Sequence, residues 1–457
     1  MLLHKRMKSC YNKLKCTVLY TPFFKDEGRK PIGKSCWYFF EMCSFGYEIT
    51  EQKGKQMTPK IHIIDAMCGL GKTSAAINYI NNDISGARFL YITPYLEEIK
   101  RINDACPRKH FYEPQAYGSK LCDIKRLIKQ NRNIASTHAL FSHFDFEIVE
   151  LMREKNYILI MDEVADVVHH LQLSSKDREL LSSLTTVDEN RLLRWNEEQD
   201  NYSGKFDLEK KLCSLRALYH YDDSAVLWMF PVEVFEAFSK IFILTYMFDA
   251  QMQRCYYDYK GIDYDYWYVQ GNSLDTYKFT DKEQIYIYPD YKSLITVLDS
   301  DILNAEGKNE FSLSSSWYKE HPQILERLQD HLNYYFRRKQ KTKSSLNMWT
   351  TFSTYENQLS GDGYKKGFLA CNARATTAYR NKTTLAYTIN YYLNPIITNY
   401  FTQCGVRVEQ DALALSELIQ WVFRSAIRDG NPITIYIPSN RMRTLFLNWL
   451  DSFSGKI

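Results

Sequence analysis

The sequence predicts an α/β protein in which parallel sheets are covered by helices on both faces. Short apolar runs alternate with stretches of helical character along most of the chain, and this alternation is typical of parallel sheets. The chain has 457 residues, which is enough for two or three domains of ordinary size. Hydrophobic residues make up 45% and charged residues 25% of it, so the composition argues against a wholly disordered or fibrous protein.

Five apolar runs predict the strands of a first sheet. They lie at residues 60–66, 87–93, 133–137, 157–161 and 241–247. Helical stretches such as 73–80 and 96–102 separate them, as βαβ units require. Residues 171–235 interrupt this rhythm. Because they are rich in Leu, Glu, Lys and Asp, we expect a helical insertion there.

The second half of the chain repeats the pattern more loosely, with apolar runs at 284–288, 347–352, 367–371 and 433–438. We therefore expect one domain at 57–285 and a second at 286–457. Residues 1–56 precede the first run and hold 11 Lys and Arg against 5 Asp and Glu. This local excess of positive charge predicts a basic N-terminal extension.

Cysteine usage and hydropathy indicate the compartment. The chain contains 11 cysteines without a dense framework, which in a chain of this length indicates reduced thiols and a cytosol-like location. Residues 383–406 lack charged side chains and His, but they carry Asn390, Asn394, Pro395, Asn399 and Gln403. These residues make insertion into a bilayer costly. We expect no membrane partner and a cytoplasmic location, which would be the host cytoplasm for a viral protein.

Residues 66–73 read Ala-Met-Cys-Gly-Leu-Gly-Lys-Thr and fit the phosphate-loop pattern. Gly69 and Gly71 let the backbone wrap around a phosphate and aim N–H groups at it. Lys72 supplies charge to the β- and γ-phosphates, and the Thr73 hydroxyl can ligate Mg²⁺. The alternative, an ordinary glycine turn before a helix, is disfavoured by the Lys-Thr pair and the flanking runs. The predicted ATP-binding residues are Met67, Cys68, Gly69, Leu70, Gly71, Lys72, Thr73 and Ser74.

The apolar run at 157–161 ends in two carboxylates, Asp162 and Glu163. Strands of an α/β sheet end at the ligand crevice. Asp162 can therefore hold Mg²⁺, and Glu163 can orient the water that attacks a γ-phosphate. The alternative is an acidic first turn of the next helix, which the helix dipole would favour.

Residues 412–428 have helical periodicity and precede an Asp-Gly-Asn-Pro stop signal. Gln420, Arg424 and Arg428 are spaced four apart, so on a helix they share one face. An amide and two cations on one face suit an anionic target such as a transferring phosphoryl group. A solvated polar face is the alternative, and for three residues in isolation it is the better supported one.

The phosphate loop, the Asp-Glu-Val-Ala-Asp strand end and residues 420–428 together resemble motifs I, II and VI of superfamily 2 (DEAD/DEAH-like) helicases. Shorter stretches are similar to motif Ia (92–94), the next strand-end motif (135–138), motif III (244–246), motif IV (347–352) and motif V (371–377). Tyr246 and Phe423 depart from the usual text of motifs III and VI. The compact sequence resembles the divergent helicase-like proteins of bacteriophages.

This resemblance implies two RecA-like domains that bind ATP and Mg²⁺ in the cleft between them. Closure on ATP and opening after hydrolysis would move one domain relative to the other along a strand. The implied metal ligands are Thr73 and Asp162. The implied catalytic residues are Lys72, Asp162, Glu163, Gln420, Arg424 and Arg428.

Two basic patches suit contacts with a nucleic-acid backbone. Residues 99–132 hold nine Lys and Arg against three Asp and Glu, and residues 337–343 hold five cations in seven positions. A solvated surface is the alternative for each patch. The aromatic segment 256–268 could stack bases, although packing inside the protein is favoured. The predicted nucleic-acid-binding residues are Thr93, Pro94, Lys100, Arg101, Ser136, Thr137, Arg374, Arg337 and Arg338, with DNA favoured over RNA.

The expected function is ATP hydrolysis by a helicase or translocase that acts on nucleic acid. One alternative is a nucleotide-gated nucleic-acid-binding scaffold that hydrolyses ATP weakly. A second is a terminase-like packaging ATPase, which would need an acidic nuclease cluster after the ATPase. The sequence beyond residue 300 shows no such cluster.

Overall fold

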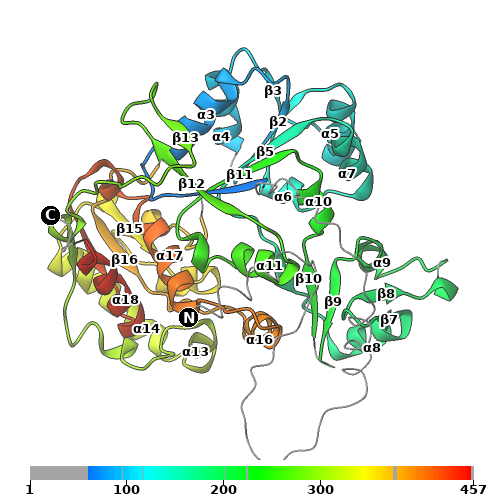
Figure 1. Ribbon diagram of the computed structural model, residues 1–457. Coiled ribbons are helices and arrows are strands. Elements are labelled where there is room, and N and C mark those ends of the chain that lie inside the picture. The colour runs from blue at the N-terminus through cyan, green and yellow to red at the C-terminus, as the bar shows by residue number, and fades with distance from the viewer. Residues whose placement is uncertain are drawn as a thin grey trace, which may run out of the picture. The chain divides into compact units, whose positions relative to one another are not determined.

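The computed structural model describes residues 60–94, 96–116, 118–199, 201–222, 225–373 and 378–453. The predicted extension at 1–56 and Arg374 lie outside these residues. The described chain builds two separate parallel sheets, one from each half, with helices packed on them (Figure 1). The predicted class, α/β with two RecA-like domains, is confirmed.

The first sheet has eight strands in the order β13-β12-β1-β11-β5-β2-β4-β3. Neighbouring strands are parallel except β12 and β13. β11 separates the strand before the phosphate loop, β1, from the strand that ends in the acidic pair, β5. The bounds are β1 Ile61–Asp65, β2 Arg88–Thr93, β3 Phe111–Tyr112, β4 Asn133–Thr137, β5 Tyr157–Asp162, β11 Lys240–Thr245, β12 Asp265–Gln270 and β13 Lys278–Thr280.

Both faces of this sheet are buried because successive side chains of a strand point to opposite faces. In β5, Ile158 and Ile160 pack with residues of α3 and α4, whereas Leu159 and Met161 pack with residues of α5 and α7. A continuous apolar run is therefore what this position requires, and all five runs predicted for this sheet form strands. The helices are α3 Lys72–Asn82, α4 Leu96–Ala105, α5 Lys120–Lys129, α6 His138–Phe141, α7 Phe146–Arg153, α10 Val232–Glu236 and α11 Met252–Lys260, with the 3₁₀ turn η2 at Phe248–Ala250.

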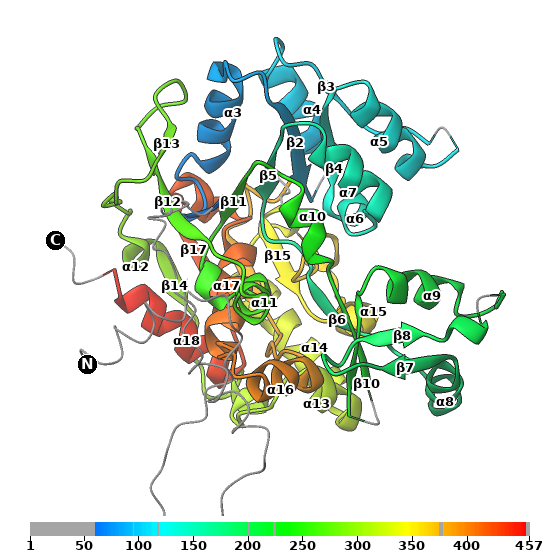
Figure 2. The ribbon, with the colours of Figure 1, turned by 45° about the vertical axis from the view of Figure 1, so that its right-hand side comes forward.

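The insertion between β5 and β11 is not purely helical, so that part of the prediction is wrong. It contains a three-stranded antiparallel sheet, β6-β10-β9, and a hairpin, β7-β8 (Figure 2). The strands β9 and β10 read LYHY and AVLWM and are almost entirely buried, and such aromatic and β-branched residues favour strands. The elements are β6 Val168–His170, α8 Ser175–Leu184, β7 Thr185–Val187, β8 Leu193–Trp195, η1 Glu197–Gln199, α9 Asp207–Ser214, β9 Leu218–Tyr221 and β10 Ala225–Met229.

The second sheet has four parallel strands in the order β14-β17-β16-β15. Its strands are β14 Ile295–Val297, β15 Asn347–Thr350, β16 Thr384–Tyr387 and β17 Ile433–Tyr436. The helices are α12 Tyr291–Leu294, α13 Ser315–Glu320, α14 Ile324–Tyr334, α15 Glu356–Leu359, α16 Pro395–Gln403, α17 Gln410–Val422 and α18 Asn440–Asp451. A π-turn, η4 Tyr335–Lys339, extends α14, and short 3₁₀ turns are η3 Ala305–Gly307, η5 Ser344–Leu346, η6 Ser353–Tyr355, η7 Lys365–Gly367 and η8 Ala426–Asp429.

Two strands expected in the second half are absent from their predicted places. Residues 284–288 form no strand, and Ile285 and Ile287 are 96% and 93% exposed, so their alternation buries nothing. Residues 367–371 make a single bridge, between Phe368 and Trp349. The uncharged stretch at 383–406 instead contributes β16 and α16, and none of the helices in the described part of the chain is long and apolar enough to cross a membrane.

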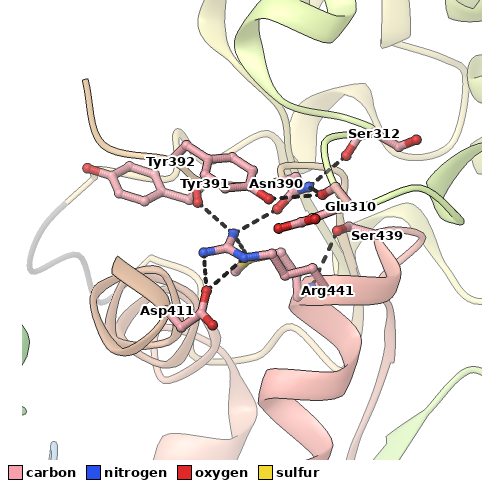
Figure 3. Close-up of polar contacts among 9 residues, drawn as sticks. Glu310, Ser312, Asn390, Tyr391, Tyr392, Asp411, Ser439 and Arg441 are labelled. Atoms are coloured by element: carbon pink, nitrogen blue, oxygen red, sulfur yellow. Dashed lines mark hydrogen bonds and ion pairs between the residues drawn. The ribbon is translucent and has the colours of Figure 1, made fainter. Parts of the chain in front are cut away.

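The segment 391–411 leaves the second sheet and returns to it, and α16 lies at its middle. Ile397, Tyr400 and Phe401 of α16 pack into the core of the first half. Arg441 joins the two ends of the excursion (Figure 3). Its guanidinium donates to Asn390 Oδ1 (2.9 Å), to the Tyr391 carbonyl (2.8 Å) and twice to Asp411 Oδ1 (2.8 and 2.6 Å).

Candidate nucleotide site

The phosphate loop connects β1 to α3 through two glycines in the left-handed backbone region. Gly69 has φ +92° and Gly71 has φ +79°, values that L side chains rarely adopt. Gly71 is the N-cap of α3, and its carbonyl accepts from the Ala75 N–H at 2.8 Å. The Lys72 ammonium donates to the carbonyls of Ala66 and Met67. The loop therefore holds its lysine and the start of α3 at one point.

The acidic pair follows β5 at the carboxyl edge of the sheet. Burial raises the pKa of Asp162 to about 7, and the neighbouring carboxylates of Glu163 and Glu98 add to the rise. Glu163 has φ +70°, which is strained for a residue with a side chain and is common at functional sites. Its N–H donates to the Leu244 carbonyl at 2.9 Å, so the neighbouring strand β11 fixes this turn.

Gln420 lies near the end of α17, but the predicted single helix through residue 428 is wrong. α17 ends at Val422. The N–H of Arg424 bonds to the Trp421 carbonyl and that of Ser425 to the Val422 carbonyl, so the spacing tightens from four residues to three. A short 3₁₀ turn, η8, follows and ends at Gly430, whose φ is +74°. Gln420, Arg424 and Arg428 thus do not share one face of a helix.

The three residues nevertheless meet the phosphate loop and the acidic pair in one cavity of about 210 Å³. Six of its residues were expected to bind phosphate or hydrolyse it from the loop and β5 side, namely Cys68, Gly69, Gly71, Lys72, Thr73 and Ser74. The other lining residues are Glu98, Arg101, Asp162, Glu163, Gln420, Phe423, Arg424 and Arg428. Met67 and Leu70 do not line it; both pack with the core of the second half.

Sequence reasoning missed Glu98 and Phe423 as cavity residues. Phe423 drew attention only as a departure from a motif. Glu98 gave one signal: the apolar residues Ile99 and Ile102 predict the buried side of α4, and that leaves Glu98 on a different side. Nothing in the local sequence says that this side faces the phosphate loop, because the crossing of α4 over the sheet decides it.

Arg424 is the cavity residue whose surroundings most require a ligand. It is 7% exposed, and its Nε is buried without a hydrogen-bond partner among the described residues. A buried donor without a partner costs free energy, and more so when it carries charge. An anionic group in this cavity would satisfy it, and Lys72 lines the same space.

Contacts between the two halves fix Gln420 next to the first sheet. Gln251, which follows η2, donates to Ser416 Oγ at 2.8 Å, and Gln420 donates to the same oxygen at 3.2 Å. A second contact runs from Trp449 Nε1 to the Tyr246 hydroxyl at 3.2 Å. Tyr246, the residue that departs from the motif III text, therefore binds α18 of the other half.

The residues present fit a magnesium ion. Thr73 and Asp162 both line the cavity and offer a hydroxyl and a carboxylate oxygen, the ligands that Mg²⁺ prefers. No group of three or more His, Cys, Asp or Glu that could hold a metal occurs in the described part of the chain. This agrees with Mg²⁺ rather than a multi-residue cage, because Mg²⁺ is commonly held by one or two carboxylates together with phosphate and water.

The residues predicted to contact nucleic acid are dispersed. Thr93 and Ser136 are buried at 0% and 2% exposure, and the Thr137 hydroxyl caps α6 by accepting from the Leu140 N–H at 3.4 Å. Lys100 is exposed and Pro94 is half-buried. Arg101 lines the nucleotide cavity.

The basic patch at 99–132 is largely compensated by nearby acids. Lys125, for example, pairs with both Asp145 and Glu147 at 2.7 Å. Other ion pairs in this region join Arg101–Glu98, Lys109–Asp83, Lys120–Glu113, Arg126–Asp123 and Lys129–Glu147. The local excess of charge in the sequence thus overstates the field that this surface presents.

Arg337 and Arg338 line a second, open cavity of about 620 Å³ at the end of α14, together with Tyr334 and Asp362. Lys365 pairs with Asp362 at 3.2 Å, so the two arginines dominate its charge. By contrast, the tyrosines of 256–268 mainly pack inside the protein: Tyr256 and Tyr257 are both 0% exposed.

Fold and site together define an α/β protein of two RecA-like domains with a phosphate loop facing arginines from the other half. Two family models match the chain: the YonV C-terminal Rossmann-like domain over residues 289–450 and the YonV middle domain over residues 168–228. The SPbeta prophage-derived uncharacterized protein YonV of Bacillus subtilis (strain 168) is 37% identical over 408 residues, which cover 86% of this chain and 99% of that protein. The chain belongs to the YonV family.

Solved helicase structures resemble the chain in fold alone, at 10% identity. An XPD helicase gives a TM-score of 0.42 over 87% of this chain and 95% of that chain. S. cerevisiae Dbp5, solved with RNA and ADP, gives a TM-score of 0.36 over 88% of this chain and 85% of that chain.

Proposed function

We propose that this protein is an ATP hydrolase of the superfamily 2 (DEAD/DEAH-like) helicase type that works as a helicase or translocase on nucleic acid. One observation carries the proposal: Arg424, buried and with an unpartnered Nε among the described residues, lines the same cavity as Lys72 and Glu163. The proposed domains are 57–285 and 286–457, and the proposed location is the host cytoplasm. DNA is favoured over RNA as the partner.

The cavity residues divide the work of phosphoryl transfer. The backbone N–H groups of the phosphate loop and Lys72 bind the β- and γ-phosphates. Glu163 orients a water molecule and accepts its proton as the water oxygen bonds to the γ-phosphorus. The bond from the γ-phosphorus to the bridging oxygen breaks, which leaves ADP and phosphate. Arg424 and Arg428 stabilise the charge on the transferring group from the side of the second half.

Thr73 and Asp162 would hold Mg²⁺, which when bound neutralises charge on the phosphate oxygens. Gln420, held by Ser416, lies where it can contact the attacking water or the γ-phosphate. Since Gln251 of the first half donates to the same Ser416 oxygen, a change at the phosphates can alter a contact between the halves. That link is the proposed route from hydrolysis to movement.

The proposed nucleic-acid contacts use the exposed cations rather than the buried threonine and serine side chains. Lys100 lies on α4, close in sequence to Pro94, and both are accessible. At the second cavity, Arg337 and Arg338 can bind phosphates, and Tyr334, which is 52% exposed, can stack a base.

The test is steady-state phosphate release by the full-length chain, with and without single-stranded DNA, duplex DNA and single-stranded RNA. We expect stimulation by at least one polynucleotide. Lys72→Ala and Glu163→Gln should each lower kcat by about 100-fold or more, because each removes a group that acts on the transition state. Glu163→Gln should still bind ATP.

Two results would contradict the proposal. Absence of stimulation by every polynucleotide would remove the link to nucleic acid. Wild-type turnover no faster than that of Glu163→Gln would instead support a nucleotide-gated scaffold.

A further inference from the structure

Two charged side chains of α4 lie in the nucleotide cavity, although they belong to neither the phosphate loop nor the acidic pair. Glu98 and Arg101 both line it, and Arg101 Nη1 is 2.7 Å from Glu98 Oε1. Residues three apart are neighbours on a helix surface. Ile99 and Ile102 anchor the other side of α4 in the core, at 5% and 0% exposure, and so fix which side of the helix faces the cavity.

The neighbouring groups place this ion pair beside the acidic strand end. Burial raises the pKa of Asp162, the Glu98 carboxylate raises it further and the Arg101 guanidinium opposes the rise. The Tyr91 hydroxyl on β2 is completely buried, has no hydrogen-bond partner among the described residues and lies within the electrostatic influence of Asp162, Glu98 and Arg101. This wall of the cavity therefore contains polar groups that a bound ligand or its water can satisfy.

The contact between Glu98 and Arg101 is easy to break. The Arg101 side chain is 51% exposed, and solvent-exposed pairs of this spacing contribute only about 0.2–0.5 kcal/mol. A triphosphate carries several negative charges and presents paired oxygens that match the planar guanidinium. It is thus a stronger partner for Arg101 than one carboxylate at the solvent boundary.

We propose that Arg101 is a catalytic residue that contacts the γ-phosphate of ATP, and that Glu98 is a positioning residue that holds Arg101 back until ATP binds. This inference rests on the proposed function, because it requires ATP in the cavity. Arg424 and Arg428 belong to the second half, so their contact with phosphate depends on how the halves approach each other. Arg101 belongs to the same half as Lys72 and reaches the phosphates without that movement.

The same helix connects the cavity to the proposed nucleic-acid contacts. α4 begins at Leu96, directly after the segment that contains Pro94, and Lys100 is exposed next to Arg101. A strand bound to Pro94 and Lys100 would shift α4 as a unit, since its apolar side leaves it free to slide only along the sheet. Such a shift separates Arg101 from Glu98, which gives a physical route for stimulation by a polynucleotide.

The test compares Arg101→Ala, Arg101→Lys and Glu98→Gln with the wild-type full-length chain. Arg101→Ala should lower kcat by about 10- to 100-fold with little change in the affinity for polynucleotide, and Arg101→Lys should recover part of the loss. Glu98→Gln should raise the rate without polynucleotide severalfold and reduce the stimulation by polynucleotide. Arg108→Ala is the matched control, because Arg108 is exposed just beyond α4 and does not line the cavity; it should leave kcat unchanged.

A binding experiment isolates the γ-phosphate. With Mg²⁺ present, Arg101→Ala should weaken binding of a fluorescent non-hydrolysable ATP analogue at least fivefold, while binding of the matching ADP analogue stays within twofold. Wild-type kcat together with weakened polynucleotide binding in Arg101→Ala would overturn the inference and make Arg101 a nucleic-acid contact. Failure of the wild-type chain to bind or hydrolyse ATP at all would instead overturn the proposed function.

Discussion

Gly71 ends the phosphate loop in a backbone conformation reserved for glycine, and an aromatic ring lies directly against it. Its φ is +79°, and a Cβ at this position would lie 2.6 Å from Cε1 of Tyr277. Gly69 has the same kind of backbone, with φ +92°, but nothing lies within 4 Å of the corresponding position. The two glycines therefore share one conformational requirement and differ in the space around them.

Gly71→Ala should destabilise the protein more than Gly69→Ala, by about 1–3 kcal/mol, because overpacking adds to the backbone strain that both variants share. Urea denaturation of the full-length chain measures the difference. The double variant Gly71→Ala/Tyr277→Ala should show strong non-additivity, because removal of the ring removes the clash. Equal losses in the two single glycine variants would contradict this.

Lys260 carries a charge inside a cluster of tyrosine rings. Its ammonium lies 4.3 Å from the ring centroid of Tyr219 and 5.3 Å from that of Tyr259, and it donates to the Tyr219 hydroxyl. Burial lowers the pKa of Lys260 to about 8, and Glu233 opposes the change only in part. The unfolded chain therefore binds more protons at this position than the folded chain between about pH 8 and pH 10.4.

The sign of this shift predicts a stability that rises with pH. The free energy of unfolding of the wild type, minus that of Lys260→Met, should increase by about 1–2 kcal/mol between about pH 7.5 and pH 9.5. Urea denaturation at several pH values measures it. Lys176→Met, at an exposed lysine, is the control and should give a difference that does not change with pH. A flat difference for Lys260→Met would show that Lys260 is not desolvated.

At the scale of elements, the sequence predicts a strand or helix well when one local pattern decides it. β4 has the predicted bounds 133–137 and β5 extends the predicted run by one residue, because both are buried on two faces and need continuous apolar runs. Residues 284–288 alternate just as well, yet no partner strand lies beside them. The short strands β14 and β16 escaped prediction because their pairing with β17, rather than their own composition, forms them.

The candidate site divides in the same way. Lys72, Asp162 and Glu163 follow from fixed spacing at strand ends, so the sequence alone predicts them. Arg424 and Arg428 were predicted for the wrong local reason, since α17 stops before them, and tertiary packing brings them into the cavity. Arg101 was expected on a nucleic-acid surface, because the sequence of α4 does not show that its polar side faces the phosphate loop.

The excursion 391–411 depends on one side chain at its base. The Arg441 side chain is 10% exposed and binds both the departing residues Asn390 and Tyr391 and the returning residue Asp411. Its guanidinium also lies over the Tyr392 ring, 4.1 Å from the centroid. A lysine keeps the charge but has no planar fork, so it cannot reach both ends at once.

Arg441→Lys should therefore lower the free energy of unfolding by about 1–3 kcal/mol. Urea denaturation provides the measurement. Arg407→Lys is the matched control within the same excursion, because the Arg407 side chain is 83% exposed and pairs only at the surface with Glu409; it should change stability too little to measure. Similar effects of the two substitutions would show that Arg441 does not hold the excursion together.

At the scale of the whole chain, the two halves share their apolar cores. Met67 of the phosphate loop packs with the core of the second half, and α16 packs into that of the first. The Tyr400 hydroxyl lies 2.8 Å from that of Tyr259, and Gln403 donates to the Tyr221 hydroxyl at 2.9 Å. Motion that opens the nucleotide cavity must therefore either carry the α16 contact along or break it.

Tyr400 offers the sharpest test of this shared core. It is 0% exposed, and truncation of a buried aromatic side chain costs about 3–5 kcal/mol. Because that loss falls on the contact between the halves, Tyr400→Ala should split calorimetric unfolding of the full-length chain into two resolved transitions, whereas the wild type unfolds with the halves coupled. Tyr400→Phe, which loses only the hydroxyl contact, and Thr402→Ala, on the exposed side of α16, should keep the wild-type profile. If Tyr400→Ala only shifts the wild-type transition to lower temperature without splitting it, other contacts across the cavity, such as Gln251 with Ser416, suffice to couple the halves.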